Sequence, residues 1–252
     1  MYSRFFVFSV NLLGLLAFEA AAADLPNADA LIDAMDQHMT FESRTAKLMM
    51  TVEGRKRTRV FEILSYGRGV ADSAMTYLKP RRDKGTKMLK LGDDLWIYMP
   101  NVDRVQKISG HMLRQGMMGS DLSYEDMMTS QKLRESYRSE VTGSEVVDGR
   151  DCWVLEMSAR DETVTYPKRK TWIAKDDKLA LKQELYALSG MHLKTWMMSK
   201  VQEFPGGRRF PTKMVIVDHI KKNSRTTLEF SDVVFGVELP REVFSKRWLE
   251  RK

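Results

Sequence analysis

Cysteine, glycine and proline are all scarce in this sequence. A single cysteine, Cys152, in 252 residues excludes an intramolecular disulfide framework and a cysteine cluster that would ligate zinc or an iron–sulfur centre. The 15 glycines and 7 prolines, with 43% hydrophobic and 30% charged residues, exclude collagen-like, low-complexity and disordered chains. The chain should therefore fold, and its length fits a single all-β sandwich or barrel domain.

Residue patterns for known catalytic and cofactor chemistry are also missing. The four histidines include no pair at metal-ligand spacing, and the sequence contains no zincin motif, nucleophile elbow, P-loop or dinucleotide fingerprint. Cys152 precedes Trp153 in an expected strand, which favours an inert buried thiol over a nucleophile. We therefore expect a protein that is not an enzyme and that binds neither a cofactor nor a metal.

The longest mostly apolar run lies near the N-terminus, from Phe5 to Phe18, directly after Arg4. Ala21 and Ala23 follow it in the small-x-small pattern that signal peptidase reads, so we predict a cleavable signal peptide over residues 1–23. The run is shorter than the roughly 20 residues of a transmembrane helix, which makes an uncleaved membrane anchor the weaker alternative.

The chain carries a formal net charge of +7, from 41 Lys and Arg against 34 Asp and Glu. Because the predicted mature chain, residues 24–252, is exported, its basic charge argues for lipid head groups or acidic proteins as partners and against nucleic acid. The alternative is that the charge serves only solubility.

One amphipathic helix is predicted at the start of the mature chain. Between Asn27 and Thr40, apolar residues recur at helical spacing, and Asn27 is a plausible N-cap. These apolar residues are Leu31, Ile32, Met35 and Met39.

After this helix, short β-branched and aromatic runs follow one another, and we expect about ten or eleven strands among them. The runs are 47–53, 58–66, 74–78, 86–91, 95–99, 104–108, 137–147, 152–159, 170–174, 179–188, 191–204, 212–220 and 226–235. Turn-forming residues between the runs predict short hairpins and hence an antiparallel meander. They are Gly54, Asp93, Asp94, Asp148, Gly149, Asp176, Asp177, Ser189, Gly190, Gly206 and Gly207.

Several of these runs are apolar on both faces, so something must cover the second face of the sheet. Examples are 95–99, 152–157 and 195–198. A helix, a second sheet or a bound apolar ligand would each serve. The tail from Pro240 to Leu249 is expected to form a short helical cap, because Val243, Phe244 and Trp248 recur at helical spacing.

Methionine is concentrated in the one segment that breaks the strand pattern, residues 110–129. Five of the 18 methionines lie there, with three glycines. These methionines are Met112, Met117, Met118, Met127 and Met128. Unbranched thioether side chains suit a surface that accepts ligands of variable outline, so we predict a mobile lid over an apolar cavity. The alternative is that they fill gaps beneath a loop.

The same segment contains the most distinctive string of the chain, Gly-Ser-Asp-Leu-Ser-Tyr-Glu-Asp, from Gly119 to Asp126. Ser123 and Asp126 are spaced as in a capping box, which explains the polar residues as the start of a short helix. We prefer this interpretation to acid–base catalysis.

With this string, the sequence resembles the exported outer-membrane lipoprotein-sorting-like (LolA-like) proteins. The matching stretches are Gly85–Leu89, Asp94–Pro100, Arg104–Val105, Gly119–Asp126, Glu184–Tyr186, Gly190, Lys194–Thr195, Pro211–Thr212, Leu239–Pro240 and Phe244. The resemblance implies a mainly β fold, with a curved antiparallel sheet that forms an incomplete, half-open barrel around an apolar cavity for acyl chains. It also implies a periplasmic location and an RND-type exporter in the inner membrane as partner.

A two-residue hairpin loop at Asp93-Asp94 would place Leu91 opposite Trp96 and Leu89 opposite Tyr98, and we assign that face to the cavity. The predicted cavity or lid residues are Leu89, Leu91, Trp96, Tyr98, Met112, Met117, Met118, Met127, Met128, Trp153, Leu155 and Met157.

The function expected from these observations is that of a periplasmic carrier. It would bind a lipid or another hydrophobic molecule and pass it to or from an envelope transport system. An adaptor that only bridges proteins, or a hydrolase with an unrecognised site, are the alternatives.

Overall fold

The computed structural model describes residues 25–128 and 133–251. The predicted signal peptide, residues 1–23, and Thr129 at the end of the predicted lid lie outside this part of the chain.

The described chain forms one antiparallel sheet of 13 strands, more than the ten or eleven expected. The strands are β1 (Ser43–Glu53), β2 (Thr58–Arg68), β3 (Asp72–Lys79), β4 (Lys87–Leu91), β5 (Asp94–Met99), β6 (Arg104–Ile108), β7 (Tyr137–Val147), β8 (Arg150–Ala159), β9 (Lys168–Ala174), β10 (Ala180–Tyr186), β11 (His192–Phe204), β12 (Arg208–Asp218) and β13 (Arg225–Phe235). Each predicted run corresponds to one of these strands, and the predicted turn residues lie at their connections, except Asp94, which begins β5.

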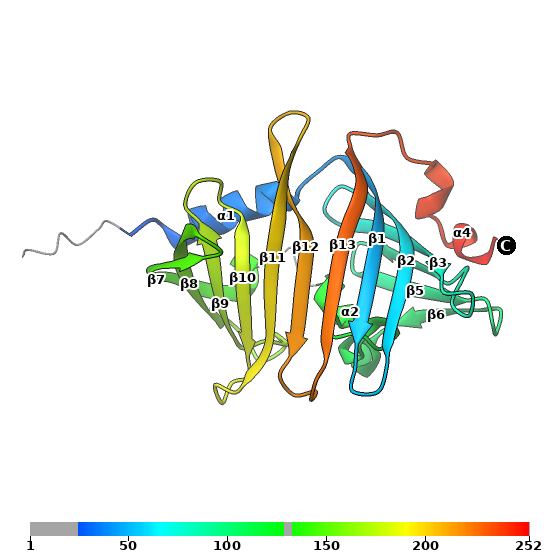
Figure 1. The fold of residues 1–252 in the computed structure, drawn as a ribbon, viewed down its shortest axis with the longest axis horizontal. Helices are drawn as coiled ribbons and strands as arrows, with labels where there is room; N and C mark the ends of the chain where they lie inside the picture. Colours follow the sequence, from blue (N-terminus) through cyan, green and yellow to red (C-terminus); the bar gives the residue numbers. More distant parts are fainter. Residues whose placement is uncertain (1–24, 129–132, 252) are drawn as a thin grey trace, which may run out of the picture.

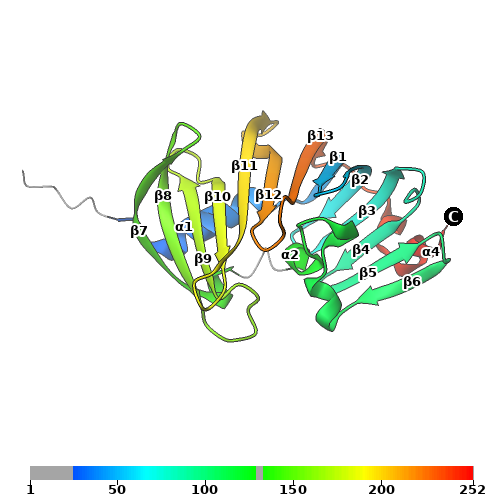
Figure 2. The same ribbon diagram turned by 60° about the horizontal axis from the view of Figure 1, so that its bottom comes forward.

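The order across the sheet is β6-β5-β4-β3-β2-β1-β13-β12-β11-β10-β9-β8-β7. The two ends of the strand series therefore meet in the middle, where β1 pairs with β13 from Arg44 opposite Phe235 to Glu53 opposite Arg225. The sheet curves strongly but stays open, because β6 and β7 form its two edges (Figure 1, Figure 2). This confirms the incomplete half-open barrel.

Seven short helical segments accompany the sheet in the described residues. They are α1 (Ala28–Met39), η1 (Gly110–Arg114), η2 (Met117–Gly119), α2 (Tyr124–Met128), α3 (Leu133–Ser136), η3 (Arg241–Phe244) and α4 (Lys246–Glu250). None of these is long and apolar enough to cross a membrane. Figure 2 shows α2 within the curve of the sheet and α4 on its outer side.

Helix α1 forms as its sequence predicts. The Asn27 side chain accepts a hydrogen bond from the backbone N–H of Ala30 at 3.0 Å, which caps the first turn. Leu31, Ile32 and Met35 are buried, and they pack on the inner face of the β7–β9 region. The helix thus supplies part of the cover that strands with two apolar faces require.

Alternation of side chains divides the β1–β6 half of the sheet into an inner and an outer face. Cross-strand partners such as Met50 and Phe61 are buried on the inner face, where segment 110–128 covers them. The outer face is covered by η3 and α4, which pack on Leu89 and Trp96. The C-terminal tail is therefore the helical cap that its apolar spacing predicts.

The predicted register of the β4–β5 hairpin is wrong. Its two-residue loop is Gly92-Asp93, so Leu89 pairs with Trp96 and Leu91 with Asp94. Gly92 has a φ of 55°, a left-handed conformation that glycine adopts without steric cost. The loop therefore begins one residue earlier than Asp93-Asp94.

Candidate functional site

An apolar cavity of about 270 Å³ lies between α1 and the inner face of the sheet near its centre. Its wall is built largely from large apolar side chains of β11, β12 and β13, with one contribution from α1. These residues are Met35, Trp196, Met198, Phe210, Met214 and Phe230. This volume lies just below the roughly 300–1,000 Å³ of small-molecule sites, so it suits one slender apolar ligand.

The register of the strands explains why these side chains converge. Trp196 lies directly opposite Ile216, and Met198 lies opposite Met214, so all four point to the same face of the sheet. Met214 in turn lies opposite Leu228 on β13, which continues the inner face into the centre of the sheet. Consecutive hairpins therefore assemble one continuous apolar wall.

Two arginine side chains interrupt this apolar wall. Arg44 at the start of β1 and Arg169 on β9 both line the cavity. The Arg169 guanidinium donates to the side-chain oxygen of Gln183 at 2.9 Å. The Nε atoms of both arginines and Nε1 of Trp196 are buried without a hydrogen-bond partner. Donors outnumber acceptors here, which is costly unless a ligand supplies an acceptor.

A carboxyl group also faces the cavity. Asp36 on α1 lines it, and burial together with the nearby charge of Asp33 raises the pKa of Asp36 to about 6. Asp36 and Arg44 also line a second pocket of about 420 Å³, which extends toward β3 and β4. The two hollows therefore adjoin each other at these residues.

One end of the inner face is closed by the Gly-Ser-Asp-Leu-Ser-Tyr-Glu-Asp string, which two buried aspartates attach to the sheet. The backbone N–H of Asp121 donates to the Thr226 hydroxyl at 2.9 Å, and that hydroxyl donates to the Asp121 carboxylate at 2.8 Å. Ser224 and Lys221 contact the same carboxylate from the β12–β13 loop. The first half of the string is thus fixed to β13.

Asp126 attaches the second half. It completes the predicted capping box, because the Ser123 N–H donates to its carboxylate at 2.7 Å and its own N–H donates to Ser123 Oγ at 3.1 Å. The same carboxylate forms an ion pair with Lys194 of β11 at 2.7 Å and accepts from the Tyr166 hydroxyl at 2.7 Å. Burial and this carboxylate raise the pKa of Tyr166, so the phenol remains a donor.

Arg59 of β2 fixes the same segment from the other side. Its guanidinium donates to the backbone carbonyl oxygens of Met118 and Gly119 at 2.8 and 3.0 Å. Gly119 has a φ of 71°, and a Cβ atom there would lie 2.9 Å from the Arg59 guanidinium. Glycine is therefore favoured here chiefly by its positive φ, which other residues rarely adopt.

The predicted lid methionines lie within this attached segment. Met117 is 1% exposed and belongs to the inner core beside Phe61 and Tyr77, so its predicted position at the rim of an open cavity is wrong. Four others are partly buried against the same core: Met112, Met118, Met127 and Met128. Met127 also lines the second pocket.

The predicted wall formed by β4 and β5 lies on the wrong face. The four residues of this group, Leu89, Leu91, Trp96 and Tyr98, pack beneath the C-terminal segment on the outer side. Met88, Leu95 and Ile97 occupy the inner face instead. Alternate residues of a strand point to opposite faces of the sheet. These four side chains point to the outer face, which η3 and α4 cover.

The third predicted group, Trp153, Leu155 and Met157, does face inward. These residues pack against α1 in the β7–β9 part of the inner core, next to the cavity. The sequence prediction does not include the cavity wall, although Trp196 and Met198 of this wall lie in the run 195–198, which is apolar on both faces. Nothing in the sequence marks Arg44 as a site residue, because the side chain of a lone arginine in a strand is usually solvated.

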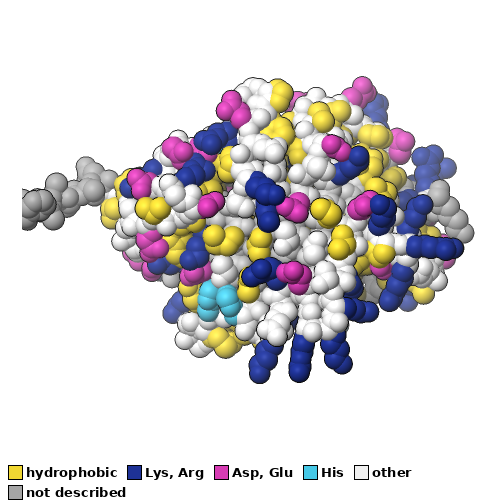
Figure 3. All heavy atoms as spheres, in the orientation of Figure 1, with side chains coloured by type: hydrophobic (Ala, Val, Ile, Leu, Met, Phe, Trp, Pro, Cys, Tyr) yellow, Lys and Arg dark blue, Asp and Glu magenta, His cyan; other side chains and the backbone are white. Residues whose placement is uncertain are grey.

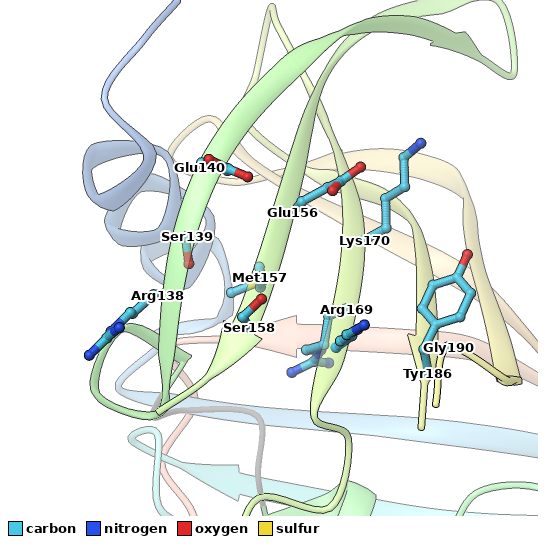
Figure 4. A pocket seen from close by; sticks show the side chains of 11 residues that line it. Arg138, Ser139, Glu140, Glu156, Met157, Ser158, Arg169, Lys170, Tyr186 and Gly190 are labelled. Carbon is cyan, nitrogen blue, oxygen red and sulfur yellow. The ribbon is translucent and has the colours of Figure 1, made fainter. Parts of the chain in front are cut away.

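A larger hollow of about 620 Å³ lies across β7 to β10 (Figure 4). Glu156 and Lys170 lie opposite each other there, on the face away from α1. Charged side chains dominate its lining, among them Arg138, Glu140 and Lys168. The cavity beneath α1 is therefore the apolar candidate site, and this hollow is not.

Metal and thiol chemistry have little support in the described residues. Within residues 25–128 and 133–251, no three His, Cys, Asp or Glu side chains are grouped so that they could hold a metal ion. Cys152 is buried, and burial raises the pKa of its thiol, which lowers its reactivity.

Comparison with known proteins places the fold. A family model described as an uncharacterized protein matches residues 69–251. No curated protein matches the sequence significantly. A DUF1329 family protein from Desulfovibrio piger has a TM-score of 0.80 and 24% identity over 88% of this chain and 98% of its own.

Two further solved structures share the fold. A putative outer membrane lipoprotein-sorting protein domain from Vibrio parahaemolyticus has a TM-score of 0.79 and 24% identity, covering 89% of this chain and 100% of its own. A LolA superfamily protein from Nitrosomonas europaea has a TM-score of 0.71 and 24% identity, covering 88% and 99%. The LolA-like fold expected from the sequence is therefore confirmed.

Proposed function

The chain belongs to the family of uncharacterized proteins whose family model matches residues 69–251. On that premise we propose that it is a non-enzymatic carrier of hydrophobic molecules. The observation that carries the proposal is the apolar cavity between α1 and the inner face of β11–β13. The fold, shared with structures named for lipoprotein sorting, supports this function.

The proposal includes a location and a partner. The signal-peptide pattern of residues 1–23 supports export to the periplasm, where a carrier would pass its ligand to or from a membrane transport system. An RND-type exporter is the partner that the sequence resemblance implies. The carrier would act without a cofactor and without nucleic acid.

Contact with an anionic membrane surface is also part of this proposal. Lys and Arg side chains project from one end of the sheet, where the β1–β2 and β12–β13 loops lie (Figure 3). Their exposed basic residues are Arg55, Lys56, Arg57, Lys221 and Lys222. Each basic residue near an anionic bilayer contributes roughly 1 kcal/mol of attraction, which would bring the carrier to its membrane partner.

Tryptophan fluorescence tests the cavity as the binding site. Trp196 lines it, whereas Trp96 is buried under the C-terminal segment on the outer face. Two variants, each retaining one of these tryptophans and carrying Phe at the other four, should be titrated with oleate after circular dichroism shows that both are folded. We expect the emission of the Trp196-only variant to shift and that of the Trp96-only variant to stay constant.

The opposite pattern would move the ligand to another face of the protein. Lipid extraction and mass spectrometry of the protein from its native compartment provide an independent test. Recovery of no hydrophobic molecule, together with no oleate binding by either variant, would contradict the carrier.

A further inference from the structure

Arg44 is a half-buried cation whose Nε atom has no polar partner among the described residues. Its guanidinium carbon lies over three phenylalanine rings, 5.0 Å from the centroid of Phe41 and 5.5 Å from those of Phe210 and Phe230. Its Nε atom is buried and makes no hydrogen bond, and no side chain among the described residues forms an ion pair with Arg44. Burial lowers the pKa of Arg44 to about 10, which still leaves it protonated at neutral pH.

Aromatic faces compensate only part of the hydration that such a cation loses. Elsewhere on the inner face this protein pairs its buried charges, since Lys194 contacts Asp126 at 2.7 Å. A charge kept only for structure would be expected to have such a partner. Arg44 instead faces both pockets, at the place where they adjoin.

Other unpartnered donors surround the same cavity. Nε1 of Trp196 and Nε of Arg169 are buried and lack acceptors. Of the two carboxylates in the lining, Asp126 already accepts from Lys194 and Tyr166. Asp36 is mostly ionised at neutral pH, but the opposite charge that acts on it is that of Arg169, and it forms no ion pair with Arg44. An anionic acceptor is the ligand group that this environment lacks.

We propose that the ligand is a single-chain amphiphile whose anionic headgroup pairs with Arg44 and whose chain lies among Trp196, Met198 and Met214. A cavity of about 270 Å³ accommodates one chain more readily than two. This inference rests on the proposed carrier function and adds the class of ligand to it. A carboxylate and a phosphate monoester share the required chemistry, because both accept two hydrogen bonds from one guanidinium.

The test compares oleate with methyl oleate, which has the same chain without the charge. Calorimetric titration of the mature wild-type protein should show oleate bound at least about tenfold more tightly, as expected for a charge-assisted pair in a buried site. Arg44→Met should reduce this preference to less than about threefold, chiefly by weakening oleate binding. Oleoyl lysophosphatidate, titrated in parallel, identifies a phosphate headgroup if it binds more tightly than oleate and a carboxylate otherwise.

Two further variants serve as controls. Arg104→Met removes the same charge from the exposed start of the edge strand β6, away from both pockets, and should leave the preference unchanged. Arg44→Lys keeps the charge and should retain part of the preference. Arg44→Met should melt no lower than the wild type, because a long apolar side chain replaces an unpaired buried charge.

The outcomes separate this inference from the carrier function. Equal wild-type affinity for oleate and methyl oleate would overturn the inference and leave the carrier standing. An unchanged oleate preference in folded Arg44→Met would also overturn it. Absence of binding by all three probes would contradict the carrier function and the inference together.

Discussion

The ion pair between Lys194 and Asp126 should be among the most sensitive sites for stability in this protein. Their side chains are 11% and 1% exposed, and Nζ lies 2.7 Å from the carboxylate. Lys194→Met removes the cation and leaves the Asp126 charge with the Tyr166 hydroxyl and the Ser123 N–H as its donors among the described residues. Removing one partner of a buried pair costs about 3–5 kcal/mol, a large fraction of the roughly 5–15 kcal/mol that holds a domain folded.

The companion variants distinguish an unpaired charge from lost packing. Asp126→Asn keeps the shape of the side chain and leaves Lys194, which is slightly more exposed, so we expect a cost of about 1–3 kcal/mol. The double variant buries no charge at this position, and it should be at least about 1–2 kcal/mol more stable than the sum of the two single effects predicts. Urea unfolding followed by circular dichroism measures all three free energies.

A matched surface pair provides the control. Lys200, on the same strand, lies 3.1 Å from Glu229, but the two side chains are 61% and 34% exposed. Lys200→Met should therefore cost only about 0–1 kcal/mol. If Lys194→Met costs no more than Lys200→Met, or if the two single effects simply add in the double variant, the argument from burial is refuted.

Two further predictions concern the methionine segment and the cavity carboxyl. Met117→Ala should destabilise the protein by about 2–5 kcal/mol in the same urea assay, because truncating a side chain that is only 1% exposed leaves a void in the core. A loss below about 1 kcal/mol would instead indicate a loosely packed segment. Asp36→Asn should raise stability by roughly 1–2 kcal/mol at pH 7.5, a value reduced for partial exposure, and change it little at pH 4. The sign follows because the folded pKa of about 6 lies above the ordinary aspartate value of 3.8, so stability is lost as pH rises through this interval. Equal effects at both pH values would contradict this reasoning.

Much of the fold could be predicted because its determinants are local. Asp148-Gly149 and Gly206-Gly207 mark hairpins by their conformational preferences, and Asn27 marks the start of α1 by its capping side chain. The pairing of β1 with β13 has no local signal, since these strands lie at opposite ends of the described chain. A series of hairpins predicts that strands consecutive in the sequence are neighbours in the sheet. It does not predict that the first and the last strand of the chain pair with each other.

The candidate site could be predicted only in part, because its location depends on which face each covering element occupies. Strand β5 is buried on both faces, so alternation alone does not separate Trp96 from Ile97. The packing of Leu249 and its neighbours on the outer face decides the question. Arg44 is still less visible in the sequence, because its isolation arises only when three strands and α1 come together around it.

Buried polar groups distinguish the attached part of the inner face from the part that is open to a ligand. Asp121 and Asp126 have donors on every side, and these bonds hold segment 119–126 against β11 and β13. Arg44 and Trp196 Nε1 lie on the same face without acceptors. Because leaving a buried polar group unpaired costs more than a satisfied hydrogen bond contributes, a stable fold tolerates few such groups, and their grouping around one apolar cavity requires a reason. A ligand with an apolar chain and an acceptor at its head provides that reason for the apolar and the polar residues at once.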